Sequence, residues 1–367
     1  MKDPRVSNLA KTLVNYSVRV QPGETVLIRG SVPALPLVTE TYREVLHAGG
    51  LPLVILQDEA LEEIFLRDAN VDQLQYVPVP MKLIYEKYDS LISIRGASNT
   101  RTLSGVDPKR QSIVQSATRE LMNLYMKRTA EGSFKWVTTL YPTAAHAQDA
   151  DMSLSDFEDF VYSACYADTA DPVSAWQAVS AQQQRLVDWL VGKDKVVVKG
   201  PNIDMQLSVK DRTFINSDGK KNMPSGEIFT GPVEESVNGW VNFSYPAIVS
   251  GREVNGIKLV FQDGKVIEAS AEKNEPFLLQ MLGLDPGARY LGEFAVGTNE
   301  QIQQFTKSIL YDEKIAGTIH MALGNGYPET GSKNESAIHW DMICDMRDGG
   351  EIFFDDQLFY RSGKFMI

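Results

Sequence analysis

The first two hundred residues alternate between apolar runs and amphipathic stretches. An apolar run, ETVLIRG, begins at residue 24, and a helical pattern that ends at Gly49 leads to a second run, LPLVILQD. Further apolar runs begin at residues 90 and 135, and the helical pattern between them has Asp107 and Pro108 as its expected N-cap and first residue. Strands that alternate with helices predict a doubly wound, mostly parallel α/β sheet.

The pattern changes after about residue 193. Short runs of alternating apolar and polar residues follow, separated by Gly, Asn, Asp and Pro, and Asp263-Gly264 is a hairpin signal between two such runs. We therefore predict an α/β domain over 1–193 and a β-rich C-terminal domain over 194–367.

Composition narrows the class of protein. A chain of 367 residues is long enough for two cores, and its net charge of −12 argues against a nucleic-acid partner. No apolar run is long enough to predict a membrane span, so no membrane partner is expected. The two cysteines, Cys165 and Cys344, lie in apolar settings and are expected to be buried thiols of a cytoplasmic protein.

Two predicted strands of the second domain carry histidines, of which the chain has only four. In AIHWDMICDM, His339 and Asp341 are two residues apart and so share one face of a strand. In KIAGTIHMALG, His320 shares its face with small residues, which would leave room for an ion or a ligand. His47 and His146 lie in unremarkable polar or helical settings and are not expected to belong to a site.

Two glutamates, Glu227 and Glu293, each follow a glycine in an apolar segment, and a glycine permits close backbone approach. A buried carboxylate needs a cation or hydrogen-bond donors, and no Arg or Lys stands out beside these residues, which suggests a metal. Imidazole and carboxylate ligands without thiolate suit Zn²⁺, Co²⁺ or Mn²⁺. Five such ligands are enough for two ions that share a bridging carboxylate, so we predict a dinuclear centre.

Simpler explanations exist for several of these residues. A histidine on an apolar strand is often a hydrogen-bonded core residue. Tyr327, in GNGYPETG, could bind metal, donate a hydrogen bond to a developing oxyanion, or pack in a turn. This glycine-rich segment lacks the order of residues that defines a phosphate-binding loop.

The segments SGEIFTGP, LGEFAVGTN, IAGTIHMALGNGYPETG and AIHWDMICDM together resemble peptidase family M29, the thermophilic aminopeptidases, and the resemblance spans nearly the whole chain. It implies a cytoplasmic, homodimeric exopeptidase that uses two divalent ions (Zn, Co or Mg) to remove N-terminal residues from peptides with a free N-terminus. The metal-site residues it implies are Glu227, Glu293, His320, Tyr327, His339 and Asp341. Of these, we choose Glu293 as the bridging ligand.

The motifs do not identify the general base, for which Glu234, Glu235 and Glu329 are candidates. The segment between Tyr327 and His339 is shorter than in longer family members, which leaves substrate preference open. We therefore predict a metal-dependent aminopeptidase. The alternatives are a non-catalytic metal-binding protein and a nucleotide-dependent oxidoreductase, against which the missing glycine fingerprint counts.

Overall fold

The computed structural model describes residues 3–249 and 251–367. The chain forms two compact units: the first holds the residues up to Trp176 together with Gly219–Pro224, and the second holds Gln177–Asp218 and Ser225–Ile367. The division falls inside helix α10 (Pro172–Leu190). The boundary near residue 193 lies just beyond this helix and stays a prediction.

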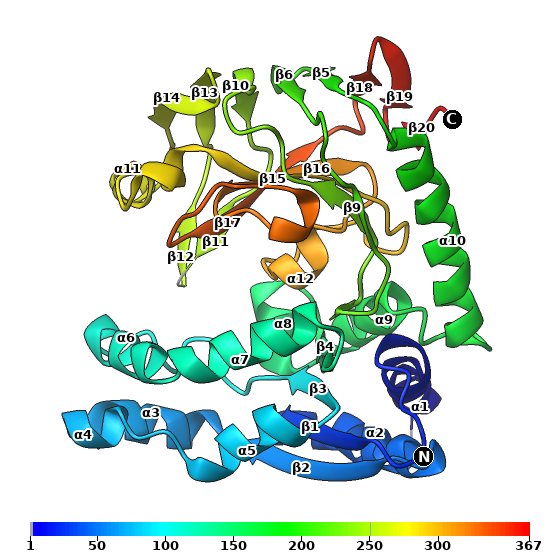
Figure 1. Cartoon of the computed structure of the whole chain (residues 1–367), viewed down its shortest axis with the longest axis vertical. Helices are drawn as coiled ribbons and strands as arrows, with labels where there is room; N and C mark the ends of the chain where they lie inside the picture. The colour runs from blue at the N-terminus through cyan, green and yellow to red at the C-terminus, as the bar shows by residue number, and fades with distance from the viewer. Residues whose placement is uncertain (1–2, 250) are drawn as a thin grey trace. The chain divides into compact units, whose positions relative to one another are not determined.

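The first unit contains the predicted parallel sheet. Its strand order is β2-β1-β3-β4-β8, and every neighbouring pair is parallel (Figure 1). The strands are β1 (Thr25–Ser31), β2 (Leu51–Gln57), β3 (Ser90–Arg95), β4 (Lys135–Leu140) and β8 (Asn222–Met223). Parallel strands need crossover connections, and the helices of this unit supply them. The predicted α/β class is confirmed.

The helix predicted to begin at Asp107 and Pro108 does begin there. Asp107 caps α6 by accepting a hydrogen bond from Lys109 N at 2.9 Å. The single helix predicted from this cap is instead two, because Thr118 leaves the helical conformation and its hydroxyl hydrogen-bonds to the Val114 carbonyl. The helical elements are α1 (Pro4–Lys11), η1 (Thr12–Ser17), η2 (Val32–Ala34), α2 (Leu35–His47), α3 (Glu59–Asp68), α4 (Val71–Leu74), α5 (Val79–Lys87), α6 (Pro108–Ala117), α7 (Arg119–Ala130), α8 (Ala144–Asp149) and α9 (Leu154–Ala164).

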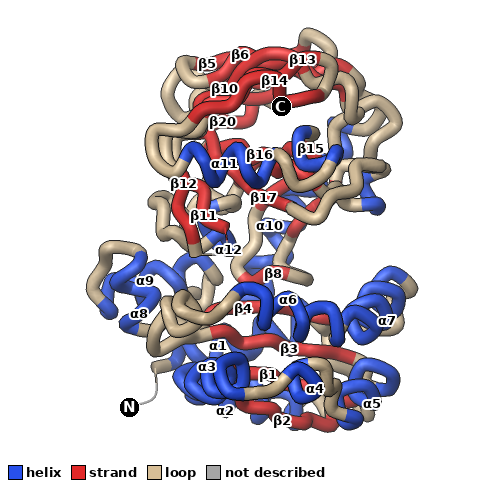
Figure 2. Tube along the Cα trace, turned by 90° about the vertical axis from the view of Figure 1, so that its left-hand side faces the viewer, coloured by secondary structure: helices blue, strands red, loops and turns tan. Residues whose placement is uncertain are grey.

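The second unit is rich in antiparallel strands, as predicted. One sheet has the order β14-β13-β10-β6-β5-β18-β19-β20, a second has the order β17-β16-β15-β9-β7, and β11 and β12 form a separate pair (Figure 2). The strands are β5 (Lys195–Gly200), β6 (Ile203–Ser208), β7 (Ile215–Ser217), β9 (Glu227–Thr230), β10 (Asn238–Asn242), β11 (Ala247–Val249), β12 (Arg252–Val254), β13 (Lys258–Gln262), β14 (Lys265–Ser270), β15 (Leu291–Gly297), β16 (Thr318–Gly324), β17 (His339–Asp345), β18 (Glu351–Phe354), β19 (Gln357–Arg361) and β20 (Lys364–Phe365).

Short helical elements connect several of these strands. They are α11 (Glu275–Leu282), η3 (Pro286–Arg289), α12 (Ile309–Asp312) and η4 (Pro328–Thr330). The predicted hairpin at Asp263-Gly264 joins β13 to β14, and both residues have the positive φ that such a tight turn requires.

A single apolar core fills the space between the two large sheets of this unit. Strands of the eight-stranded sheet contribute residues such as Val198 and Met205, and the five-stranded sheet contributes Phe294, Met321 and Met342. Because side chains alternate along a strand, the residues between these core positions point to the opposite face of the five-stranded sheet. That face carries the predicted chemistry.

Candidate metal centre

Strand pairing brings the predicted ligands to one face of the five-stranded sheet. Glu293 on β15 pairs with Ala322 on β16, and Ala322 pairs with Asp341 on β17. His339 pairs with Gly324, and Glu227 on β9 pairs with Gly297. Residues that lie directly opposite in antiparallel strands have their side chains on the same face. Ala322 and the two glycines therefore leave open space between the larger polar side chains.

The glycine before each glutamate is required by close backbone approach. A Cβ on Gly292 would lie 2.3 Å from the Asn325 carbonyl oxygen, and the strand has a bulge at this point that re-aims Glu293. Gly226 has φ +119°, and a Cβ there would lie 2.6 Å from Asn299 Cβ. The sequence-based reason given for these glycines is confirmed.

Glu293 occupies the centre of the cluster. Its Oε1 lies 3.5 Å from His320 Nε2, and its Oε2 lies 3.3 Å from His339 Nε2. His320 Nε2 is also 3.3 Å from Glu227 Oε2, and His339 Nε2 is 3.4 Å from Asp341 Oδ1. Each oxygen of Glu293 therefore faces a different histidine, as a carboxylate that bridges two ions would.

The orientation of His339 is fixed by its second ring nitrogen. Nδ1 lies 2.7 Å from the Asn325 carbonyl oxygen and donates to it, because a carbonyl can only accept. Nε2 is thereby directed into the cluster. Metal-binding histidines are commonly oriented by this kind of hydrogen bond.

Several polar atoms of the cluster are buried without a hydrogen-bond partner among the described residues. They include Glu227 Oε2, Asp341 Oδ1 and His320 Nδ1. Glu227, Glu293 and His320 are each at most 4 % exposed, so water does not readily satisfy these atoms. Buried polar atoms without partners are costly, and two of the three are carboxylate oxygens that a bound cation would satisfy.

Lys314 and Glu313 also belong to this cluster, and the sequence analysis missed both. Lys314 is fully buried, its Nζ lies 3.5 Å from Glu227 Oε1, and it forms an ion pair with Glu313. The expectation that no lysine stands beside the carboxylates was therefore wrong. The reason is that DEKIAG, just before β16, has the composition of an exposed turn, and only the fold buries it.

The charges of the cluster remain unbalanced in spite of Lys314. Four carboxylates (Glu227, Glu293, Glu313 and Asp341) face one ammonium, which leaves three negative charges when both imidazoles are neutral. Three groups of these residues have ligand atoms within 4.8 Å of one another: Glu227, Glu293 and His320; Glu293, His339 and Asp341; and Glu313, His320 and Asp341. The donor set and the charge fit divalent cations.

Without a metal, protons must supply the positive charge. Burial opposes a charge on His320, but hydrogen bonding to Glu293 and the charge of Glu227 outweigh it and raise the pKa of His320 to about 9. In the same way, burial opposes a charge on His339, while the charge of Asp341 and the close contacts with Asp341 and Glu293 raise its pKa to about 12. Burial raises the pKa of Glu313 to about 7, assisted by the charges of Glu227 and Asp341.

Tyr327 lies against His339, with ring centroids 5.0 Å apart, and its other side contacts Phe229. Burial and the charges of Glu293 and Asp341 hold the pKa of the phenol well above its usual value. The phenol therefore stays protonated at neutral pH and can donate a hydrogen bond. Its role as a metal ligand stays a prediction.

The candidate general bases are not part of the cluster. Glu234 forms an ion pair with Arg212 at 2.6 Å and accepts a hydrogen bond from Lys333 N at 2.6 Å. Glu235 is exposed, and Glu329 is exposed in η4. Glu313 is a further carboxylate for this role, and nothing in the sequence distinguished it from a surface residue.

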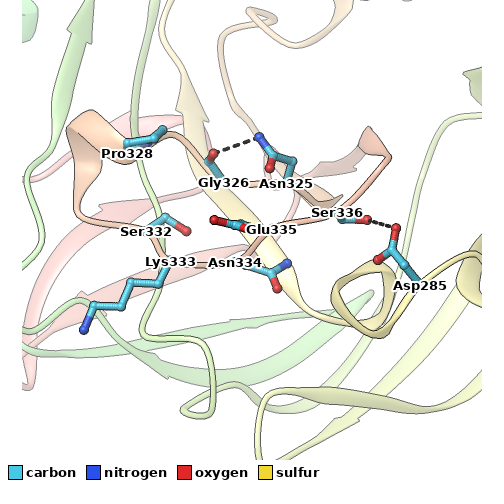
Figure 3. Close-up of a pocket in the computed structure, with 9 residues that line it drawn as sticks. All are labelled: Asp285, Asn325, Gly326, Pro328, Ser332, Lys333, Asn334, Glu335 and Ser336. Carbon is cyan, nitrogen blue, oxygen red and sulfur yellow. Dashed lines mark hydrogen bonds between the residues drawn. The ribbon is translucent and has the colours of Figure 1, made fainter. Parts of the chain in front are cut away.

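The loop that follows Tyr327 lines a cavity of about 600 Å³ (Figure 3). Asn325 hydrogen-bonds to the Gly326 carbonyl there, and Ser336 donates to Asp285 at 3.0 Å. Asn325, which lines this cavity, also supplies the carbonyl that orients His339.

Comparison with known proteins agrees with this chemistry. The family described as thermophilic metalloprotease (M29) matches residues 2–365. The chain is 28 % identical to Aminopeptidase 2 of Geobacillus stearothermophilus, covering 94 % of this chain and 93 % of that protein. It is 25 % identical to Aminopeptidase T of Thermus thermophilus, covering 92 % and 91 %. The chain belongs to the M29 family.

Solved structures agree on the fold. AmpT from Thermus thermophilus matches with a TM-score of 0.86 and 22 % identity over 99 % of both chains. A 2,5-dihydroxypyridine dioxygenase from Pseudomonas putida KT2440 matches with a TM-score of 0.63 and 12 % identity, covering 98 % of this chain and 96 % of that one. One fold thus hosts different chemistries, and the site decides between them.

The predicted class of enzyme is confirmed: the chain is a metal-dependent aminopeptidase of family M29. The two alternatives, a non-catalytic metal-binding protein and a nucleotide-dependent oxidoreductase, are not favoured. Among the described residues, no helix combines the length and apolar character needed to cross a membrane.

Proposed function

We propose that this enzyme removes the N-terminal residue from peptides by means of two divalent ions, drawn from Zn, Co or Mg, held by Glu227, Glu293, His320, His339 and Asp341. The observation that carries the proposal is the position of Glu293, whose two oxygens face different histidines at 3.5 and 3.3 Å. Glu227 completes the ligand group around His320, and Asp341 completes the group around His339.

When bound, the two ions would lower the pKa of a water molecule to about 7 and polarise the scissile carbonyl. The protein's own groups would prepare the site for this. Glu293 contributes negative charge to both positions, and the Asn325 carbonyl holds His339 with Nε2 directed inward. Lys314 fixes Glu227 through its Oε1 and leaves Oε2 for an ion.

We assign the proton transfer to Glu313. Its carboxylate is grouped with His320 and Asp341, and burial raises its pKa to about 7, close to the value at which a group can both accept and release a proton. Glu234 is a weaker candidate because Arg212 and the Lys333 amide already occupy its oxygens. We assign Tyr327 as a donor to the developing oxyanion.

Acidic side chains around the site also suit a substrate with a free, positively charged α-amino group. This would limit the enzyme to the ends of peptides. An acetylated peptide lacks that charge and should not be cleaved.

We also propose that the protein is a cytoplasmic homodimer. Both cysteines are free and buried, which is typical of a reducing compartment. The edge strand β2 exposes Leu51, Leu53 and Leu56, and an exposed apolar edge strand is a surface that can pair with another chain. Sedimentation equilibrium would test the dimer.

Hydrolysis of leucine p-nitroanilide by the purified enzyme tests the proposal. Activity should disappear with a chelator and return on addition of Co²⁺ or Zn²⁺, and N-acetylleucine p-nitroanilide should not react. Full activity in a chelator, in protein shown by elemental analysis to hold no metal, would contradict the mechanism. Equal cleavage of free and acetylated substrates would contradict the requirement for a free N-terminus.

A further inference from the structure

A small cavity opens beside the candidate metal centre. Its volume is about 210 Å³, and Asp341, a proposed ligand, forms part of its wall. The neighbouring wall is Ile343, which follows Asp341 on the same face of β17 and pairs with His320 across the sheet. The cavity and the metal centre therefore share one sheet surface.

The remaining lining residues are apolar except for two charged ones, Lys307 and Asp312. Ala247 and Ile248 come from β11. Ser244, three residues before this strand, donates its backbone N–H to the Ile343 carbonyl at 2.9 Å. Phe305 also lines the cavity and stacks on Tyr245 with ring centroids 5.0 Å apart. Ile309, at the start of α12, is 44 % exposed.

Asp312 also lines the cavity, but its charge already has a structural use. Asp312 Oδ1 accepts hydrogen bonds from the Thr306 backbone N–H at 2.7 Å and from the Thr306 hydroxyl at 2.8 Å. These bonds fix the loop that carries Lys307, which has a left-handed backbone with φ +62°. The carboxylate is thus committed to holding the loop, and apart from Lys307 the remaining lining is apolar.

We propose that this cavity is the subsite for the side chain of the substrate's N-terminal residue, and that it selects large apolar side chains. The inference rests on the proposed function. The side chain of that residue branches from the carbon next to the scissile carbonyl, so it must lie beside the ions when the carbonyl is positioned for attack. At roughly 30 Å³ for a water-sized group, the volume holds about seven such groups, enough for a leucine or phenylalanine side chain.

The experiment compares two variants of equal exposure. Ile309→Trp fills the cavity, whereas Leu279→Trp places the same bulk on α11, at a leucine that is also 44 % exposed. The p-nitroanilides of Ala, Leu, Phe, Lys and Glu serve as substrates, and metal content is measured for each protein. Wild type should prefer Leu and Phe over Ala by at least about tenfold in kcat/KM.

Ile309→Trp should lose at least about tenfold in kcat/KM for Leu and Phe and less for Ala, with wild-type metal content. Leu279→Trp should keep the wild-type selectivity. Unchanged selectivity in Ile309→Trp, or a wild-type preference for Glu or Lys, would overturn the subsite alone. If wild type cleaves none of the substrates, the proposed function is overturned and the subsite with it.

Discussion

Strand β17 carries two aspartates four residues apart, Asp341 and Asp345, and their surroundings differ. Asp345 accepts hydrogen bonds from Arg347 Nε at 3.0 Å and from the Tyr245 hydroxyl at 3.0 Å. Asp341 faces His339, and its Oδ1 has no hydrogen-bond partner among the described residues. The Asp345 carboxylate is part of a completed ion pair with Arg347. The Asp341 carboxylate has only a histidine beside it, which carries a charge only when protonated.

The two aspartates also differ in whether the partner side chain can release a proton. Burial opposes the charge on both, but Arg347 lowers the pKa of Asp345, and His339 lowers the pKa of Asp341 to about 2. A guanidinium keeps its proton, whereas an imidazole can lose its proton and bind a metal. Only the end of β17 that holds Asp341 can therefore exchange protons for an ion.

Paired substitutions should separate these two kinds of carboxylate. Asp341→Asn removes a proposed ligand, so metal content should fall and kcat/KM should drop at least about a hundredfold, because ions contribute several kcal/mol to the transition state. Asp345→Asn should keep both ions and most activity, and should lose about 1–3 kcal/mol of stability because Arg347 loses its charged partner. Elemental analysis measures the metal content, thermal melting measures the stability, and kinetics measures kcat/KM. The reverse pattern would contradict the distinction.

The sequence predicted the Asp341 end of this strand because His339 and Asp341 alternate with core residues at a spacing of two. It also predicted that the backbone approaches another segment closely at the glycine before each glutamate. It did not predict Lys314, because burial of a turn depends on how the chain returns to the sheet, not on local pattern. The break of the helix at Thr118 was missed for a related reason. A threonine can continue a helix or interrupt it, and the local sequence does not show which occurs.

The variant Tyr327→Phe tests whether the phenol is a metal ligand or a hydrogen-bond donor to the transition state. As a donor, Tyr327→Phe should lower kcat by about a hundredfold with no change in metal content. As a ligand, the same variant should lose metal as well. Metal analysis together with single-substrate kinetics separates the two roles, and a variant with normal kcat would exclude both.

The smallest expected effect is a pH dependence of the metal-free protein. The pKa of His320 rises from about 6.5 in the unfolded chain to about 9 in the folded one. The folded state therefore holds more protons in this window, and stability should fall as the pH rises from about 6.5 to about 9, by up to about 1.4 kcal/mol per pH unit for each such group.

The same protons should be released when metal binds, since a histidine ligand must be neutral. Binding enthalpies in buffers of different ionisation heat would reveal this release near pH 7. A metal affinity that does not increase with pH over this range would contradict the assignment of His320 and His339 as ligands. His47, which is far more exposed, offers a control: His47→Gln should leave the proton release unchanged.

The most direct measurement is the metal content of Glu293→Gln. This change keeps the volume of the side chain but removes the charge that lets two cations lie side by side. We predict about two ions per chain in wild type and at least one fewer in Glu293→Gln, with kcat and kcat/KM falling together in a folded protein. A Glu293→Gln protein that holds two ions and has normal activity would contradict the central claim.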